Sequence, residues 1–582
     1  MLRGEDAVPE KKETVVVTGS YDPIPLQEAD RAVRSFDVRK LSLLSNSFAD
    51  LLKLDSSLDL RQRSPNGVQG DLSIRGGTFG QTLILLDGMR LNDVQSGHHN
   101  LDLPVPLEAI ATIEVLKGSG STLYGSDAVG GVVNFITKPP EHTEMRLRGA
   151  AGNFGVNQQR GDVSYAARRW SQQLSVSRDF STGFIPNRDY RNLSASSRTS
   201  LTTGLGTTAL TLAANDRPFG AEQFYGDFNS WERTRTWFAS ARQSLGSKTD
   251  AAFAYRRHTD LFVLYRDRPQ EFTNRHAVES YQASLRRREE LGRNWKLFYG
   301  AEVYHDTIDS NNLGSHRRIR GAPYVSLDVR ALRRFSFSVG LRDEIYGSAN
   351  HELSPSIAAG YWIAPSLKLR ASVSRAFRLP TYTDLYYQDR QNIGSPNLRP
   401  ERAWSYEGGL DWNAGGRIRA GVAVFQRRER DGIDFVRRSE SEMWRATNFQ
   451  RLQFTGVEAS VALRMAAHEV EWQYTGLRGA QDRLDGLLSK YVFNYPIHSG
   501  VVAWQGSFRG NIVARTRIGV LQRYQRDSYG LWDLYAASSR YRVRPFLQLS
   551  NATNTRYEEI PRVAMPGRSV VGGLEILVFG SR

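Results

Sequence analysis

The sequence predicts an all-β membrane protein, in which a transmembrane β-barrel follows a small N-terminal α+β domain. Segments that alternate apolar and polar residues continue from Met145 to Phe579, with turn residues between them and hardly any helical periodicity. We count about 22 such segments, each roughly 10 residues or longer, which is the length of a tilted membrane-spanning strand. A mean hydropathy of −0.47 and the lack of an apolar run of roughly 18 residues exclude a bundle of membrane helices.

The first 140 residues differ from the rest in charge and in pattern. They hold 14 Lys and Arg against 18 Asp and Glu, so the net charge of +16 comes entirely from the remainder. Residues Ser47–Leu54 read as an amphipathic helix turn and Leu83–Leu86 as a buried strand, and Ile110–Leu116 and Val132–Ile136 read as further strands. A small α+β domain of about 100 residues fits this mixture.

The alternation in the second part is clear in Phe335–Arg342 and in Leu367–Ser374. In a closed barrel the apolar side chains meet lipid, the polar ones line the lumen, and every backbone amide is paired. A propeller or several soluble sandwiches could show the same spacing, but no motif repeats at a blade-length period. Connectors rich in Asp, Arg, Tyr and Gly, namely Pro218–Arg233 and Thr381–Glu401, are predicted as external loops.

Several function classes are excluded or disfavoured by what the sequence contains. The chain has no Cys, which excludes a disulfide scaffold, a thiolate zinc site and a cysteine nucleophile. Arg residues are scattered singly among polar and aromatic residues, which argues against nucleic-acid binding. No phosphate-loop, hydrolase or zinc-protease motif occurs, so we expect no enzyme, no catalytic residue, no cofactor and no metal site. Asp179, Asp189 and Asp227 fall in predicted loops, but nothing makes them converge as a calcium site would require.

The N-terminus has no apolar segment of the kind that a signal peptide contains. We interpret this as a signal that was removed, or missed when the start was assigned.

Ordered motifs resemble one known family along essentially the whole chain. In the first part they are Leu72-Ser73-Ile74-Arg75-Gly76-Gly77, Leu83–Asn92, Ile113-Glu114-Val115-Leu116-Lys117-Gly118 and Leu123–Asn134. In the second part they are Phe377-Arg378-Leu379-Pro380, Ser395–Glu401, Gly456-Val457-Glu458 and the series Asn551, Asn554, Tyr557, Pro566-Gly567-Arg568. The ordered set resembles the TonB-dependent outer-membrane receptors. The family usually has Pro where Ser119 stands, and usually ends on an aromatic residue where Gly580-Ser581-Arg582 follow Phe579 here.

The resemblance implies an architecture and a location. It implies a periplasmic segment over residues 1–30, a plug domain over 31–140 inside the lumen, and a 22-stranded antiparallel barrel over 141–582. It also implies a monomer in the bacterial outer membrane, in contact with its lipids and lipopolysaccharide, and driven by TonB with its inner-membrane energising complex.

The resemblance also implies energy-coupled import of a scarce, large nutrient. The Arg-rich lumen and loops suit an anionic or metal-chelating ligand, so a ferric siderophore is the first choice. Cobalamin is the second, because the short chain and compact plug resemble the vitamin B12 receptors. A passive porin would explain the strands but not the N-terminal domain, and a barrel enzyme would need a site that no motif indicates.

The first candidate site is a segment that resembles a TonB box: Glu13, Thr14, Val15, Val16, Val17, Thr18 and Gly19. A short β-branched run after a charged start can add as a strand to the sheet edge of another protein. The alternative is an ordinary first strand of the plug. The plug motifs that follow favour the TonB box.

The second candidate site is a latch between plug and barrel. In the resembled family two plug cations meet two barrel glutamates, and the matching positions are Arg75 and Lys117 against Glu401 and Glu458. A partly buried charge cluster would hold the plug, because the loss of one partner leaves an uncompensated charge. The alternative is that each charge is a solvated residue of the lumen.

The third candidate site is His98, His99 and Asn100, in a plug loop expected to face outward. Adjacent His residues with aromatic neighbours could contact a metal complex or a corrin-like ring. The alternative is a polar loop bonded to the barrel wall. The family's haem receptors tend to carry a His between the two barrel motifs, and residues 381–394 contain none, which argues against haem.

Overall fold

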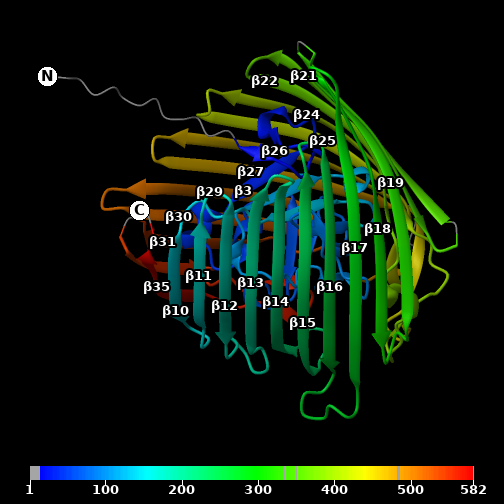
Figure 1. The fold of residues 1–582 in the computed structure, drawn as a ribbon. Coiled ribbons are helices and arrows are strands. Elements are labelled where there is room, and N and C mark those ends of the chain that lie inside the picture. The colour runs from blue at the N-terminus through cyan, green and yellow to red at the C-terminus, as the bar shows by residue number, and fades with distance from the viewer. Residues whose placement is uncertain (1–13, 333, 349, 482–485, 540, 581–582) are drawn as a thin grey trace.

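The computed structural model describes residues 14–332, 334–348, 350–481, 486–539 and 541–580. Within them, 22 long antiparallel strands form one closed barrel, and the domain formed by residues 14–140 lies inside it, as the blue elements of Figure 1 show. Closure is made by the last strand, β35, which pairs with β32 on one side and with the first barrel strand, β10, on the other. The predicted fold class is therefore confirmed.

The long strands of the first half of the barrel are β10 (Glu144–Gly152), β11 (Asn157–Ala166), β12 (Trp170–Ser181), β13 (Tyr190–Thr203), β14 (Gly206–Glu222), β15 (Asn229–Leu245), β16 (Thr249–Val263), β17 (Thr273–Gly292), β18 (Trp295–Ser310), β19 (His316–Leu332) and β20 (Phe335–Tyr346). Those of the second half are β21 (Asn350–Ala364), β22 (Leu367–Arg378), β24 (Glu401–Ala414), β25 (Ile418–Arg437), β26 (Trp444–Met465), β27 (His468–Gln481), β29 (Pro496–Phe508), β30 (Ile512–Arg523), β31 (Tyr529–Ser538), β32 (Val543–Ser550) and β35 (Ser569–Phe579).

The barrel has an apolar outside and a polar inside, and β12 illustrates the rule. Ser171, Gln173 and Ser175 are buried toward the lumen, while Leu174 and Val176 are 49% and 55% exposed on the outer face. This arrangement is the reverse of that in a water-soluble protein, and it is stable only where the outer face meets lipid. Among the described residues, no helix is both long and apolar enough to cross a lipid bilayer.

One predicted loop is shorter than expected. The sequence predicts an external loop over Pro218–Arg233, but Pro218 and Arg233 are paired in register, and only residues 223–228 connect β14 to β15. The charged and aromatic composition of this segment resembles that of a loop, but it is also typical of strand ends. The outer ends of barrel strands extend past the lipid, and polar side chains are tolerated there on both faces of the sheet. The connection from β22 to β24 is irregular apart from a short helix, α4 (Tyr382–Tyr386), and a two-residue strand, β23 (Asn392–Ile393). The other short strands of the barrel part are β28 (Leu488–Ser489), β33 (Glu558–Ile560) and β34 (Val563–Ala564).

The plug is built around a five-stranded sheet in the order β3-β8-β9-β6-β7. The strands of the plug are β1 (Val15–Val16), β2 (Ile24–Pro25), β3 (Val33–Asp37), β4 (Leu58–Gln62), β5 (Gly70–Ile74), β6 (Thr82–Leu86), β7 (Met89–Arg90), β8 (Thr112–Lys117) and β9 (Gly131–Ile136). Its helices are α1 (Val38–Leu41), α2 (Phe48–Leu52) and α3 (Ser121–Tyr124), with 3-10 turns η1 (Leu26–Glu28), η2 (Ser42–Leu44), η3 (Pro65–Gly67), η4 (Phe79–Gln81), η5 (Gly97–His99) and η6 (Leu107–Ala109).

The plug core explains why these segments form the sheet. Ile84, Ile113, Val115, Val133 and Phe135 are fully buried in one cluster, so the short apolar runs in the sequence are central strands. The helix at 48–52 begins with a capping box in which Ser47 and Asp50 exchange hydrogen bonds with the backbone.

Candidate functional site

Arg75 of the plug lies at the centre of a buried charge cluster that it shares with residues of the barrel. This residue follows β5, and its Nε and Nη2 donate to the two carboxylate oxygens of Glu458 on β26, at 2.7 and 3.0 Å. Its Nη1 donates to Glu407 on β24, and its guanidinium lies 4.2 Å from the ring centre of Phe425. The Arg75 side chain is only 3% exposed, so these bonds are shielded from water.

Lys117, at the end of β8, joins the same cluster. Its Nζ lies 3.1 Å from Asp55 of the plug and 3.4 Å from Glu458 of the barrel. Burial opposes ionisation of Asp55, but Lys117 and Arg34 outweigh it and hold the pKa of that carboxyl well below its usual value. The cluster therefore links two plug cations to the barrel through charged hydrogen bonds.

The fourth predicted member of the latch does not lie in it. Glu401 binds Arg378 at 2.7 and 3.1 Å, and it meets the plug through Gln81 Nε2 at 3.0 Å. Glu407 contacts Arg75 instead. The two glutamates are on the same face of β24 but six residues apart, which separates their Cα atoms by roughly 20 Å. Strand alternation indicates that both glutamates face the lumen, but it does not indicate which of them contacts Arg75 of the plug.

The segment that resembles a TonB box is docked on the plug over its described part, Thr14 to Gly19. Glu13 lies outside the described residues. Val15 and Val16 form β1, which pairs with β2, and the Val16 side chain is fully buried against Ile24 and Ala29. Val15 is 47% exposed.

One carboxylate holds the following residues. Oε2 of Glu114, on β8, accepts hydrogen bonds from Val17 N at 2.9 Å, from Thr18 N at 2.8 Å and from Thr18 Oγ1 at 2.6 Å. Burial raises the pKa of the Glu114 carboxyl, although these bonds act in the opposite direction. Any strand addition by a partner at Val17 and Thr18 would first have to break this contact.

His98 and Asn100 have partners inside the protein. His98 Nδ1 lies 2.8 Å from Asp71 Oδ1, and its ring stacks on Phe79 with 4.3 Å between the ring centres. Asn100 accepts from Asp93 N at 3.0 Å and donates to Phe79 O at 3.2 Å. Burial lowers the pKa of His98, although Asp71 opposes the shift. Over the described residues, His98 and Asn100 therefore bond to other residues of the plug, and not to the barrel wall as the alternative interpretation expected.

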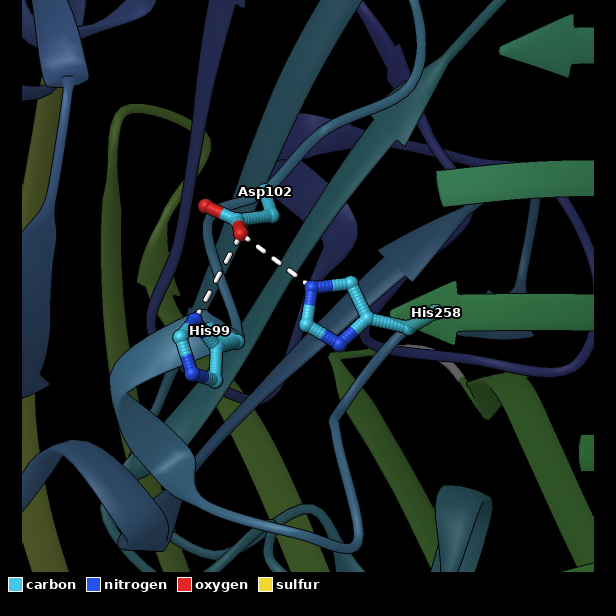
Figure 2. Close-up of side chains that lie close together, drawn as sticks. All are labelled: His99, Asp102 and His258. Carbon is cyan, nitrogen blue, oxygen red and sulfur yellow. Dashed lines mark hydrogen bonds and ion pairs between the residues drawn. The ribbon is translucent and has the colours of Figure 1, made fainter. Parts of the chain in front are cut away.

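His99 points to the barrel wall. Its Nδ1 lies 3.5 Å from Asp102 and its Nε2 lies 3.4 Å from Asp260 of β16, and His258 of the same strand approaches Asp102 from the other side (Figure 2). Asp102, His258 and Asp260 were not among the residues predicted for this site. No regular spacing connects position 99 to positions 258 and 260, so no sequence pattern indicates this cluster.

A second group that the sequence analysis missed lies at the outer ends of β25 and β26. Lys490 Nζ lies 5.6, 5.9 and 5.4 Å from the ring centres of Phe435, Trp444 and Tyr491, and donates to Asn392 at 2.7 Å. We call Phe435, Trp444, Lys490 and Tyr491 the external aromatic cluster. Burial lowers the pKa of Lys490 to about 8.

Comparison with known proteins identifies the family. The model of the TonB-dependent receptor plug domain matches residues 25–132, and the model of the TonB-dependent receptor-like β-barrel matches residues 148–554. The chain therefore belongs to the TonB-dependent receptors. It is an outer-membrane receptor with a plug and a barrel, and not an enzyme.

The names of the relatives point to more than one role. The vitamin B12 transporter BtuB of Photobacterium profundum is 22% identical over 482 residues, which are 75% of each chain. An iron-regulated outer membrane virulence protein of Vibrio cholerae serotype O1 (strain ATCC 39541) is 25% identical over 566 residues, covering 86% of this chain and 83% of the relative.

Solved structures share the fold. The siderophore receptor PirA of Acinetobacter baumannii superposes with a TM-score of 0.78 at 15% identity, covering 95% of this chain and 99% of PirA. The Serratia marcescens hemophore receptor HasR, in complex with its hemophore HasA and heme, gives a TM-score of 0.78 at 17% identity, covering 94% and 99%.

Proposed function

We propose that this receptor imports a ferric siderophore by energy-coupled transport, with cobalamin as the alternative cargo. The observation that carries the proposal is a folded plug seated in a closed barrel and held there by Arg75 and Lys117 on Glu458. A large cargo crosses such a barrel only if the plug moves or partly unfolds, so transport needs an external source of work.

The external aromatic cluster supports the choice of cargo. Aromatic faces next to an ammonium and a guanidinium suit an anionic chelate with aromatic groups, because stacking and charge attraction act together. Arg437 adds a second cation, 4.3 Å from the ring centre of Trp444. Cobalamin has a broad ring rimmed by amides, so it would use the aromatic faces but depend little on Lys490.

The coupling segment, Glu13 to Gly19, is the proposed contact with TonB and its inner-membrane energising complex. TonB would pair with the extended segment once Val17 and Thr18 leave Glu114. A pull on this segment would then reach the plug sheet through β1 and β2 and load the latch.

A transport assay tests the proposal. A strain lacking its own receptors would express this chain and receive radiolabelled ferric siderophores and cobalamin in parallel. We expect uptake of a ferric siderophore, no uptake with Val16→Pro, and unchanged binding of the cargo by that variant, because proline removes the ladder donor. Val16→Ala keeps the donor and is the matched control. Uptake by Val16→Pro at the wild-type rate would contradict the coupling segment, and uptake of cobalamin alone would select the alternative cargo.

A further inference from the structure

Two histidines and an aspartate meet where the plug touches the barrel (Figure 2). Asp102 Oδ2 lies 3.5 Å from His99 Nδ1 and 3.3 Å from His258 Nε2, and the three atoms all lie within 4.8 Å of one another. His99 and Asp102 belong to the plug and His258 to β16. The three residues are 5%, 6% and 0% exposed.

These separations match the edges of a metal coordination sphere. Metal–nitrogen and metal–oxygen bonds of about 2.0–2.1 Å at tetrahedral angles place ligand atoms about 3.3–3.4 Å apart. Two imidazoles and one carboxylate form a donor set that suits zinc and similar transition metals, whereas calcium and magnesium prefer oxygen alone.

The surroundings supply the supporting carboxylates that metal-binding histidines require. His258 presents its other ring nitrogen, Nδ1, to Asp93 Oδ2 at 2.7 Å, and His99 presents Nε2 to Asp260 Oδ2 at 3.4 Å. A carboxylate on the far nitrogen fixes the tautomer and the ring orientation, so that the near nitrogen has a lone pair for the metal. Both histidines have a carboxylate within 3.4 Å of the far nitrogen, although the angle at His258 Nδ1 falls short of a hydrogen bond.

The charge balance also points to a cation. The buried charged groups around the three residues are four carboxylates and two guanidinium groups: Asp93, Asp102, Glu232, Asp260, Arg217 and Arg256. The carboxylates outnumber the guanidinium groups, so a cation at the centre of the cluster, either a metal ion or a proton on His99, is favoured there.

Unpartnered polar atoms are a second, independent indication of a ligand. Within the described part of the chain, Asp260 Oδ1, Thr234 Oγ1 and Thr236 Oγ1 are buried without a hydrogen-bond partner. Thr236 pairs in register with His258, and Thr234 with Asp260, so these hydroxyls lie on the strand directly beside the cluster.

We propose that His99, Asp102 and His258 bind one divalent transition-metal ion of the zinc class, which ties the plug to the barrel wall. Glu232 and Asp260, on the other side of His99, orient that ring. The ion forms a plug–barrel fastening in addition to the Arg75 latch, because it uses other residues and another strand.

The test uses the full chain, purified in detergent, stripped of metal, and refolded with Co²⁺ so that burial does not limit access. We expect one Co²⁺ per chain with the strong visible absorption of a four-coordinate ion, and displacement of Co²⁺ by Zn²⁺. His99→Gln in the plug and His258→Gln in the barrel should each weaken binding at least 10-fold. Zn²⁺ should raise the plug's unfolding temperature in the wild type but not in these two variants.

Two histidines outside the cluster provide the controls. His98→Gln removes the neighbouring plug residue, and His351→Gln removes a barrel residue whose side chain is 68% exposed. Both should bind Co²⁺ as the wild type does, and heat-modifiable gel mobility confirms that each barrel is folded. Wild-type protein that binds no Co²⁺, a folded His258→Gln variant that binds it unchanged, or a site that takes Ca²⁺ in preference to Co²⁺ would overturn the proposal.

Discussion

Removal of the Arg75–Glu458 interaction should loosen the plug without unfolding the barrel. Arg75→Met keeps an apolar stem over Phe425 and removes the guanidinium, which leaves Glu458 with Lys117 at 3.4 Å as its remaining ion-pair partner. Removing one partner of a buried ion pair lowers the stability of the folded protein, here of the seated plug, by about 3–5 kcal/mol. Glu458→Gln should cost less, about 2–3 kcal/mol, because Arg75 retains Glu407 and Lys117 retains Asp55.

A double-mutant cycle isolates the interaction itself. We expect a coupling energy of about 1.5–3 kcal/mol between Arg75 and Glu458, since two charged hydrogen bonds join them. The chain has no Cys, so a single fluorophore on Lys40→Cys, whose native side chain is 78% exposed on the plug, would report plug unfolding in urea while the barrel stays folded.

The matched control is the cycle of Arg75→Met with Glu401→Gln. Glu401 belongs to the Arg378 cluster, so this pair should be additive within about 0.5 kcal/mol. Strict additivity between Arg75 and Glu458, or a larger coupling between Arg75 and Glu401, would refute the latch as the structure places it.

Three further predictions concern the coupling segment, the external aromatic cluster and the lipid face. Glu114→Ala removes the acceptor for Val17 and Thr18, so it should speed proteolysis of the coupling segment and strengthen capture of a soluble TonB fragment. Glu114→Gln keeps an acceptor and is the control. Equal protease sensitivity of the two variants would contradict the role of Glu114 in holding the segment. Lys490, with its pKa lowered to about 8, should lose its charge as the pH rises from about 7 to about 9, which weakens binding of an anionic cargo. The unfolded lysine titrates at roughly 10.4, so between about pH 8 and about pH 10 the unfolded state binds more protons than the folded state, and the free energy of unfolding should rise with pH. If Lys490→Met shows the same loss of cargo binding and the same rise in stability, Lys490 is not the group that titrates. Leu174→Arg, near the middle of β12, should make folding into liposomes less favourable by about 2–4 kcal/mol, while Leu174→Ile folds normally. An equal folding yield of the two variants would mean that Leu174 does not face lipid.

The barrel could be predicted from the sequence because its signal is local. The alternation in Phe335–Arg342 and Leu367–Ser374 is a property of neighbouring residues, and these segments lie in β20 and β22. The apolar run Leu83–Leu86 indicates a central strand for the same reason and lies in β6. The prediction for Pro218–Arg233 was wrong because composition alone does not show where pairing ends.

The sequence by itself determined the class of protein and the order of its two domains, and the family resemblance pointed to Arg75 and Lys117 as plug cations that meet barrel glutamates. Only the tertiary structure decided which residues meet across the lumen: Glu407 rather than Glu401 on Arg75, and His258 with Asp102 beside His99. Alternation assigns a side chain to the inner or the outer face. Its partner depends on how far the plug is inserted and rotated within the barrel, and that is set by packing between residues hundreds of positions apart.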